Sequence, residues 1–228
     1  MNERIVIVTG SVPVPSHVVS TVPDTAIVLA VDGGLDHALA AGFEPSGLIG
    51  DLDSVTPEGL AWAEEHATIS RHPADKDQTD TELALEFAAA MNPAAITLIG
   101  GGDRLDHTIA ALGALGAIEL TGVPSVDAWW DGQHVDVVHG PGSSTLRLRT
   151  GSTLSLLALQ GPCEKVSISG VRWELDHVTL DPTVGRGVSN ETVEPDVHVA
   201  LTKGVLTIFD VPETGDASPA AEIDEGRS

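Results

Sequence analysis

The sequence has one cysteine, no tyrosine and only three phenylalanines in 228 residues. The single cysteine, Cys163, excludes an intramolecular disulfide framework and a metal site built from clustered cysteines. It also predicts a reducing, cytoplasmic setting. No apolar run is long enough to cross a membrane. Met1–Arg4 leads directly into a strand-like run, so we expect no signal peptide.

Positive charge is also scarce, with 11 Lys and Arg against 34 Asp and Glu and a formal net charge of -23. A general nucleic-acid binder needs positive charge to displace counterions, so this class is excluded. A nucleotide ligand remains compatible with the composition, because metal ions can bridge phosphates to an acidic site.

The first half of the chain alternates short apolar runs with helix-like segments. Near-continuous apolar strands joined by helices predict a mainly parallel sheet covered on both faces, in a Rossmann-like α/β domain over residues 1–124. The expected strands are Arg4–Gly10, Ala26–Val31, Gly47–Ile49, Ala67–Ser70 and Ala95–Ile99. The expected helices are Leu35–Ala41, Glu58–His66, Thr81–Met91 and Asp103–Leu120.

The pattern changes after Pro124, where short strand-like segments are separated by Gly and Pro and the helical periodicity ends. This predicts an all-β sandwich or barrel over residues 125–212. The expected strands are Val126–Trp130, His134–Val138, Ser144–Leu148, Thr153–Leu157, Val166–Ile168, Val197–Leu201 and Val205–Phe209. Residues 213–228 are acidic and small, and we expect this tail to be disordered.

Acidic residues follow the ends of the expected strands. Asp51 and Asp53 come after Gly47–Ile49 and before a helix start at Thr56-Pro57. Ligands of open α/β sheets bind at this rim, and two carboxylates spaced i and i+2 suit a hard cation such as Mg²⁺. The alternative is an acidic turn with solvated side chains.

Further acids occur at positions that converge on the same rim. Several carboxylates on one rim repel each other unless cations are present, and metal-dependent phosphate chemistry is the natural use of such a rim. Asp75 and Asp103 are better interpreted as helix caps. The remaining acids of this set are Asp32, Asp77, Asp80 and Asp106.

Three glycines and two rare bases accompany these acids. Gly100–Gly102 would let backbone amides approach an anion at a helix N-terminus, or could form a ligand-free turn. Lys76 and Arg104 favour phosphate contacts, with internal salt bridges as the alternative. His107 by itself is better explained by packing or hydrogen bonding.

Six sequence blocks, taken in order, resemble the thiamin pyrophosphokinase family in its prokaryotic form. The resemblance extends over about Gly10 to Phe209. Leu52 departs from the family's usual aromatic, and Ala110-Ala111 stands where members often have an asparagine. The blocks are Val31–Gly34, Gly50–Ser54, Asp75–Leu85, Gly102–His107, Gly170–Leu175 and Gly187–Glu191.

The resemblance implies an α/β nucleotide-binding domain followed by a β-sandwich, with the active site at a homodimer interface. It implies Mg²⁺-dependent transfer of diphosphate from ATP to the hydroxyl of thiamin, giving thiamin diphosphate and AMP. The implied metal-binding and catalytic acids are Asp51, Asp53 and Asp80. The implied nucleotide and phosphate neighbours are Asp32, Gly33, Lys76, Asp77, Thr79, Gly102, Arg104, Asp106 and His107. The implied thiamin pocket is Trp173, Ser189 and Asn190.

Two other functions are compatible with the residues. A diphosphokinase for another hydroxymethyl heterocycle, such as a pterin alcohol, would keep the acidic rim and change the second-domain pocket. A non-catalytic thiamin or nucleotide sensor would not need the complete set of acids. Trp173 itself could be a core residue of the β-domain instead of a stacking surface.

Overall fold

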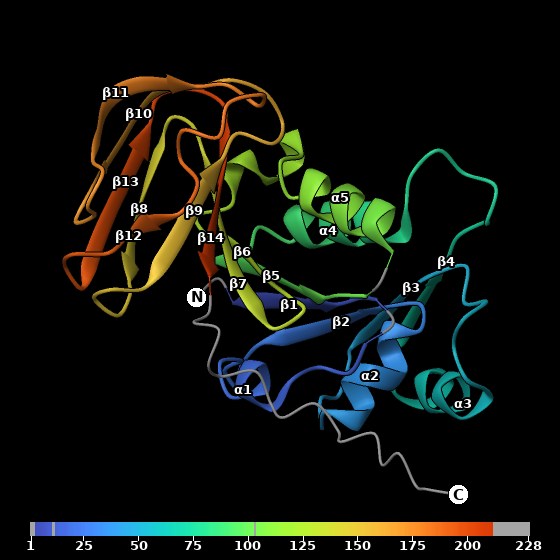
Figure 1. The fold of residues 1–228 in the computed structure, drawn as a ribbon. Coiled ribbons are helices and arrows are strands. Elements are labelled where there is room, and N and C mark those ends of the chain that lie inside the picture. The colour runs from blue at the N-terminus through green and yellow to red at the C-terminus, as the bar shows by residue number, and fades with distance from the viewer. Residues whose placement is uncertain (1–2, 11, 103, 212–228) are drawn as a thin grey trace, which may run out of the picture.

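A computed structural model describes residues 3–10, 12–102 and 104–211. The strands form a ten-stranded sheet and a four-stranded sheet. Figure 1 shows the helices around that part of the larger sheet whose strands come from the first half of the chain. The tail that we expected to be disordered, residues 213–228, lies outside the described residues.

The N-terminal part of the large sheet is parallel, in the order β6-β5-β1-β2-β3-β4. Its central strands are buried almost throughout, because helices cover both faces, and this explains their continuous apolar sequences. The α/β prediction is confirmed. The strands are β1 (Arg4–Val8), β2 (Ile27–Val31), β3 (Gly47–Gly50), β4 (Thr68–Arg71), β5 (Ala95–Gly100) and β6 (Val126–Trp130).

Two helical layers enclose this sheet. The layer above the sheet in Figure 1 contains α4 (Asp80–Ala90) and α5 (Leu105–Ala114), with the 3-10 helix η1 (Ile118–Gly122) beside α4. The layer below contains α1 (Ser16–Val19), α2 (Gly34–Ala40) and α3 (Pro57–His66). The single helix expected over Asp103–Leu120 is therefore two shorter ones, separated at Gly116.

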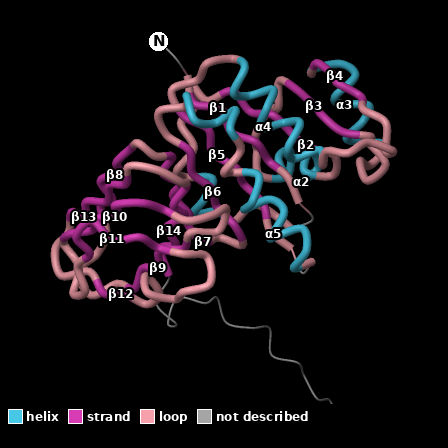
Figure 2. The backbone as a smooth tube through the Cα atoms, turned by 90° about the horizontal axis from the view of Figure 1, so that it is seen from above, coloured by secondary structure: helices cyan, strands magenta, loops and turns pink. Residues whose placement is uncertain are grey.

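The large sheet continues into the second half of the chain without a break. After β6 it becomes antiparallel, in the order β7-β14-β9-β12. Figure 2, from above, shows these strands on the side of the molecule away from α3. They are β7 (Gln133–His139), β14 (Val205–Val211), β9 (Thr153–Leu157) and β12 (Asn190–Glu191).

The four-stranded sheet packs on this antiparallel end through a second apolar core and completes the predicted β-sandwich. One expectation was wrong in detail. Val126–Trp130, which we assigned to the β-domain, pairs parallel to β5, and its side chains Val126 and Ala128 belong to the α/β core. The four strands are β8 (Gly142–Arg147), β10 (Cys163–Ser169), β11 (Leu175–Leu180) and β13 (Asp196–Leu201).

Hydroxyl caps fix where two helices begin. Thr56 Oγ1 accepts a hydrogen bond from the Gly59 amide at 3.0 Å, ahead of Pro57 in the first turn of α3. Thr79 and Glu82 form a reciprocal capping box on α4. Asp75 therefore does not cap α4 as we expected, and Asp103 lies outside the described residues. No described helix is long and apolar enough to cross a membrane.

A charged network lies across β6, β7 and β14. The ring of His134 packs against Trp129 and lies 3.3 Å from the carboxylate of Asp136. Burial alone would lower the pKa of His134. The hydrogen bond and charge of Asp136, together with Asp127 and Asp210, raise that pKa above its usual value.

This raised pKa predicts a pH-dependent contribution to stability. A histidine whose pKa is higher in the folded state stabilises fully below its unfolded value of 6.5, and the effect is lost as pH rises through the folded pKa. We expect the unfolding free energy to decrease by about 0.5–1 kcal/mol more between pH 6 and pH 8 in the wild type than in His134→Gln. Urea unfolding at both pH values measures this. His66→Gln, on the exposed end of α3, should keep the wild-type slope, and an unchanged slope in His134→Gln would contradict the assignment.

Candidate active site

The adjacent parallel strands β2 and β3 end side by side, because Val31 is in register with Ile49. Asp32 follows β2 in a left-handed conformation, with φ of 45°. Its backbone amide donates to the Ile49 carbonyl at 3.1 Å, and its Oδ1 accepts from the Leu52 amide at 3.0 Å. The ends of the two strands are therefore joined by both backbone and side chain of one residue.

The turn after β3 carries two of the predicted acids. Asp51 Oδ1 accepts a hydrogen bond from the Asp53 amide at 3.0 Å. Leu52, between them, has a φ of 69°, a conformation that costs a non-glycine residue about 1–2 kcal/mol. Its side chain is 7% exposed and packs in the core under α2 and α3, where burial contributes about 1.5–3 kcal/mol. The buried leucine, which stands where the family usually has an aromatic, therefore anchors the turn.

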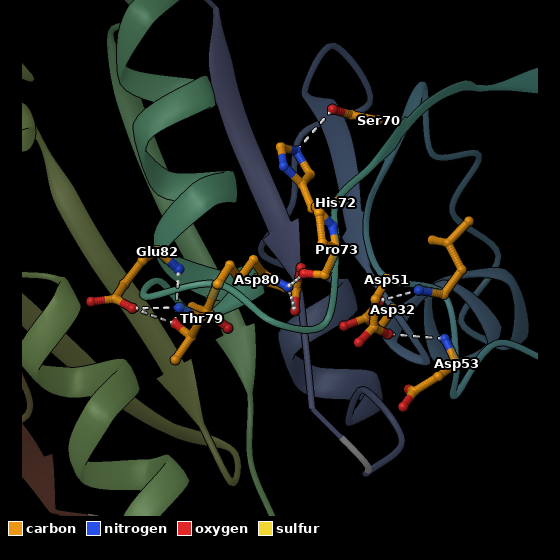
Figure 3. Close-up of polar contacts among 12 residues, drawn as sticks. Asp32, Asp51, Asp53, Ser70, His72, Pro73, Thr79, Asp80 and Glu82 are labelled. Atoms are coloured by element: carbon orange, nitrogen blue, oxygen red, sulfur yellow. Dashed lines mark hydrogen bonds and ion pairs between the residues drawn. The ribbon is translucent and has the colours of Figure 1, made fainter.

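Asp80, the third predicted acid, is the first residue of α4 and lies across from the turn (Figure 3). Its Oδ2 accepts a hydrogen bond from Lys76 Nζ at 3.0 Å, and Lys76 also donates to the Pro73 carbonyl. Its Oδ1 is buried and has no hydrogen-bond partner among the described residues. A buried carboxylate oxygen without a partner is costly unless a cation or donor reaches it.

The carboxylates act on one another electrostatically. The pKa of Asp32 is raised to about 6, first by burial and then by the charges of Asp80, Asp51 and Asp53, against the lowering effect of the Leu52 amide. Within the described ranges, no three His, Cys, Asp or Glu side chains are already arranged around a metal position. The carboxylate chemistry and the unpartnered Asp80 Oδ1 nevertheless fit a hard cation.

The predicted phosphate contacts already have protein partners in this structure. Arg104 pairs with Asp106 at 2.6 Å and lowers the pKa of that carboxyl. The Thr79 hydroxyl belongs to the capping box, and the Gly102 amide donates to Asp131 Oδ1 at 3.0 Å. The salt-bridge alternative therefore describes both Lys76 and Arg104 in this state. Of the three other predicted neighbours, Asp77 and His107 are exposed and adjoin Lys76 and Asp106 in the sequence, whereas the Gly33 amide donates to Ser54 Oγ.

Asp131 is a residue of this rim that sequence reasoning missed. It follows β6 with a φ of 50°, and a Cβ on Gly101 would come within 2.1 Å of its Oδ1. The available signal was its place directly after an apolar strand, before Gly132. Because we assigned that strand to the β-domain, Asp131 was not placed with the other strand-end acids.

The second predicted cluster is built around a buried amide. Asn190 is 5% exposed, and its Oδ1 accepts from the Trp173 amide at 3.1 Å while its Nδ2 donates to the Trp173 carbonyl at 2.8 Å. Trp173 is 56% exposed, and the Arg172 guanidinium lies 5.1 Å from the centre of its indole ring. Trp173 is therefore not a core residue. Ser189, exposed with a φ of 58°, precedes the amide.

Asn190 should therefore stabilise the fold by holding the backbone of Trp173. Asn190→Ala would leave the Trp173 amide and carbonyl without their buried partner, so we expect a loss of about 1–3 kcal/mol of unfolding free energy. Urea unfolding measures it. Thr179→Ala, at an exposed position of β11, is the control and should change stability by less than about 0.5 kcal/mol. A wild-type stability in Asn190→Ala would show that these bonds contribute nothing.

The two clusters lie far apart within one chain. Asn190 is on β12, at one end of the ten-stranded sheet, and Asp51 follows β3, next to the other end. Eight inter-strand steps of about 4.8 Å separate these strands, or roughly 38 Å along the sheet. Figure 1 shows β12 and β3 on opposite sides of the molecule.

Comparison with known proteins connects the two clusters to one family. The model of the thiamin pyrophosphokinase catalytic domain matches residues 19–123, and the model of its vitamin B1 binding domain matches residues 143–206. Together the matches span 169 of the 228 residues and contain the residues of both clusters except Asp131, which lies between the two matched ranges. The chain belongs to the thiamin pyrophosphokinase family. This family is one of diphosphotransferase enzymes, and the resemblance seen in the sequence blocks is confirmed.

Individual members of the thiamin pyrophosphokinase family agree with this. The thiamine pyrophosphokinase of Bacillus subtilis strain 168 is 27% identical over 186 residues, covering 79% of this chain and 85% of that protein. The crystal structure of a Bacillus subtilis thiamine pyrophosphokinase has a TM-score of 0.79 at 22% identity, covering 92% of this chain and all of the other. A Candida albicans thiamin pyrophosphokinase has a TM-score of 0.71 at 14% identity, covering 92% and 90%. The predicted fold class is confirmed.

Proposed function

We propose that this chain transfers the diphosphate of ATP to the hydroxyl of thiamin, forming thiamin diphosphate and AMP. The observation that carries the proposal is the acidic cluster at the ends of β2 and β3 and the start of α4. Asp80 Oδ1 is buried there without a described partner, and its charge acts with those of Asp51 and Asp53 on Asp32. Family membership supplies the substrates.

The acids of this cluster fit Mg²⁺, with Asp51, Asp53 and Asp80 as the residues that would hold it. Bound there, Mg²⁺ would neutralise charge on the phosphates. In this proposal Lys76 and Arg104 exchange their present carboxylate partners, Asp80 and Asp106, for the phosphates. We assign the remaining nucleotide contacts to Gly33, Asp77, Thr79, Gly102, Asp106 and His107.

In this reaction the hydroxyl oxygen of thiamin forms a bond to the β-phosphorus, and the bond from that phosphorus to the bridging oxygen of AMP breaks. Such transfers depend on positioning and charge neutralisation more than on covalent help from the protein. The proton of the hydroxyl passes to a carboxylate of the cluster, a step that contributes about 10²–10⁴-fold where a general base is used.

We further propose that the working enzyme is a homodimer. Within one chain, the exposed Trp173 is bonded to Asn190 of β12, and β12 is roughly 38 Å along the sheet from β3, which precedes Asp51 and Asp53. A second copy can place its Trp173 loop, with Ser189 and Asn190, against the acidic cluster of the first. The cytoplasmic setting inferred from Cys163 stays a prediction.

The activity is tested by measuring AMP formation from ATP with thiamin, with a hydroxymethyl pterin, and without acceptor, each with and without Mg²⁺. We expect AMP only with thiamin and Mg²⁺. Preference for the pterin would indicate a diphosphokinase of another specificity. Thiamin binding by calorimetry without AMP formation would indicate a sensor.

A further inference from the structure

We propose that Asp32 is a positioning residue, which holds the turn that carries Asp51 and Asp53, and not a direct contact of the metal or the nucleotide. This corrects the nucleotide-binding role that the sequence resemblance implied for it. The inference rests on the proposed function in one respect, namely that Asp51 and Asp53 bind the cation.

The first support is the hydrogen bond from the Leu52 amide to Asp32 Oδ1, at 3.0 Å. Leu52 stands between Asp51 and Asp53. A hydrogen bond that holds its N–H therefore also restricts the backbone conformation of the turn that carries both carboxylates. Both partners are non-glycine residues in the left-handed region, with φ of 45° at Asp32 and 69° at Leu52. Such conformations persist where the surroundings hold them, and here each residue holds the other.

The second support is the space reserved for this carboxylate. A Cβ on Gly50 would lie 1.8 Å from Asp32 Oδ1 and 2.5 Å from its Cγ. Gly50 has a φ of 147°. Glycine before Asp51 is therefore required both by its backbone conformation and by the Asp32 side chain, which occupies the volume that any other residue would fill.

The third support is a similar bridge one helical turn further along. Asp36, on α2, accepts a hydrogen bond from the Thr56 amide at 3.0 Å and another from the Thr56 hydroxyl. It joins the same two segments, also across 20 residues, but it holds the start of α3 instead of the turn with the predicted metal acids. Asp36 therefore offers a matched control: an equivalent bridge without the positioning role.

The experiment compares the double variant of Asp32→Ala with Gly50→Ala and six single variants of the full-length chain. The single variants are Asp32→Asn, Asp32→Ala, Gly50→Ala, the controls Asp36→Ala and Gly42→Ala, and the reference Asp51→Asn. Asparagine keeps an oxygen that can accept the Leu52 amide, whereas alanine removes it. The first readout is Mn²⁺ binding without nucleotide, measured as the half-saturation concentration by calorimetry. The second is hydrogen exchange of the Leu52 amide, and the third is kcat and KM for thiamin.

We expect Asp32→Asn to bind Mn²⁺ within about threefold of the wild type and to retain most of the kcat. Asp32→Ala and Gly50→Ala should each weaken Mn²⁺ binding about 10–100-fold, lower kcat and speed exchange at Leu52, with little change in KM for thiamin. The double variant should be no worse than Gly50→Ala alone, because both changes break the same contact and the loss of the Asp32 carboxylate removes the clash with the new Cβ. Asp36→Ala should lower the melting temperature without weakening Mn²⁺ binding.

Gly42→Ala is the control for backbone strain alone, because Gly42 has a φ of 85° and a Cβ added there would meet nothing within 4 Å.

Two results would overturn the proposal. If Asp32→Asn loses as much Mn²⁺ affinity as Asp51→Asn, the Asp32 charge itself contacts the cation. If Asp32→Ala matches the wild type in all three readouts, the hydrogen bond positions nothing. Failure of the proposed function is recognised separately, because the wild type would then bind Mn²⁺ no better than Asp51→Asn, while exchange at Leu52 would still report whether Asp32 holds the turn.

Discussion

Asp51→Asn and Asp53→Asn should each lower kcat by about 10²–10³-fold while the fold survives. An amide keeps the shape of the carboxylate and removes the charge that a hard cation needs. In Asp51→Asn, the amide side chain would retain the oxygen that accepts the Asp53 backbone N–H. The pKa of Asp32 is raised first by burial and then by its acidic neighbours, so removing a charge near Asp32 should not reduce stability. The measurements are AMP formation across a Mg²⁺ titration and thermal unfolding of the metal-free proteins.

Asp24→Asn is the matched control for these two variants. Asp24 is an exposed aspartate in the loop before β2, at the opposite end of that strand from Asp32. It should keep wild-type activity at every Mg²⁺ concentration. Wild-type activity of both Asp51→Asn and Asp53→Asn at limiting Mg²⁺ would remove the metal role from this turn.

Trp173→Ala should raise the KM for thiamin while the KM for ATP and the melting temperature change little. The thiazolium of thiamin is a cation, and an indole face attracts a cation by about 0.5–2 kcal/mol, which corresponds to about 2–30-fold in KM. Because Arg172 already lies over the Trp173 ring, we expect thiamin to stack on the opposite face. Trp173 is 56% exposed, so the stability loss expected for a core tryptophan should not occur.

Trp62→Ala is the control for Trp173→Ala, since Trp62 is also partly exposed but stacks on His66 in α3, away from the β-domain. It should leave the KM for thiamin unchanged. An equal rise in both KM values in Trp173→Ala, together with a lower melting temperature, would show that this tryptophan supports the fold and not the substrate.

The proposed sharing of the site between two subunits predicts complementation between two damaged proteins. In a heterodimer of Trp173→Ala and Asp51→Asn, one site carries both changes and the other carries neither. Random exchange of equal amounts makes half of the dimers mixed, so the intact sites should add about a quarter of the wild-type activity. The assay uses thiamin below its KM and compares the mixture with the mean of the separate proteins. No gain after exchange has been proven by native mass spectrometry would refute a site shared between subunits.

Much of the acidic rim could be predicted from the sequence because its cause is local. Asp32 and Asp51 directly follow apolar strands, Asp53 comes two residues after Asp51, and the carboxyl ends of parallel strands share one edge. The starts of α3 and α4 were also accessible, since Thr56 and Thr79 act within a few residues of their own positions. The six ordered blocks identified the family before any contact was known.

Only the tertiary structure decided which groups these residues contact. A short apolar strand does not specify its partner, so the pairing of β6 with β5, and with it the placement of Asp131, depended on burial against distant helices. Residue type alone also does not say whether a lysine or arginine contacts a phosphate or a carboxylate. In the structure, Lys76 pairs with Asp80 and Arg104 pairs with Asp106. Residue type likewise does not show that the Asn190 side chain is buried and bonded to the Trp173 backbone. The sequence determined that the acids would meet at the strand ends. The tertiary structure decided that Asp32 holds the turn and that Trp173 lies at the other end of the sheet, because hydrogen bonds and packing between distant segments set both.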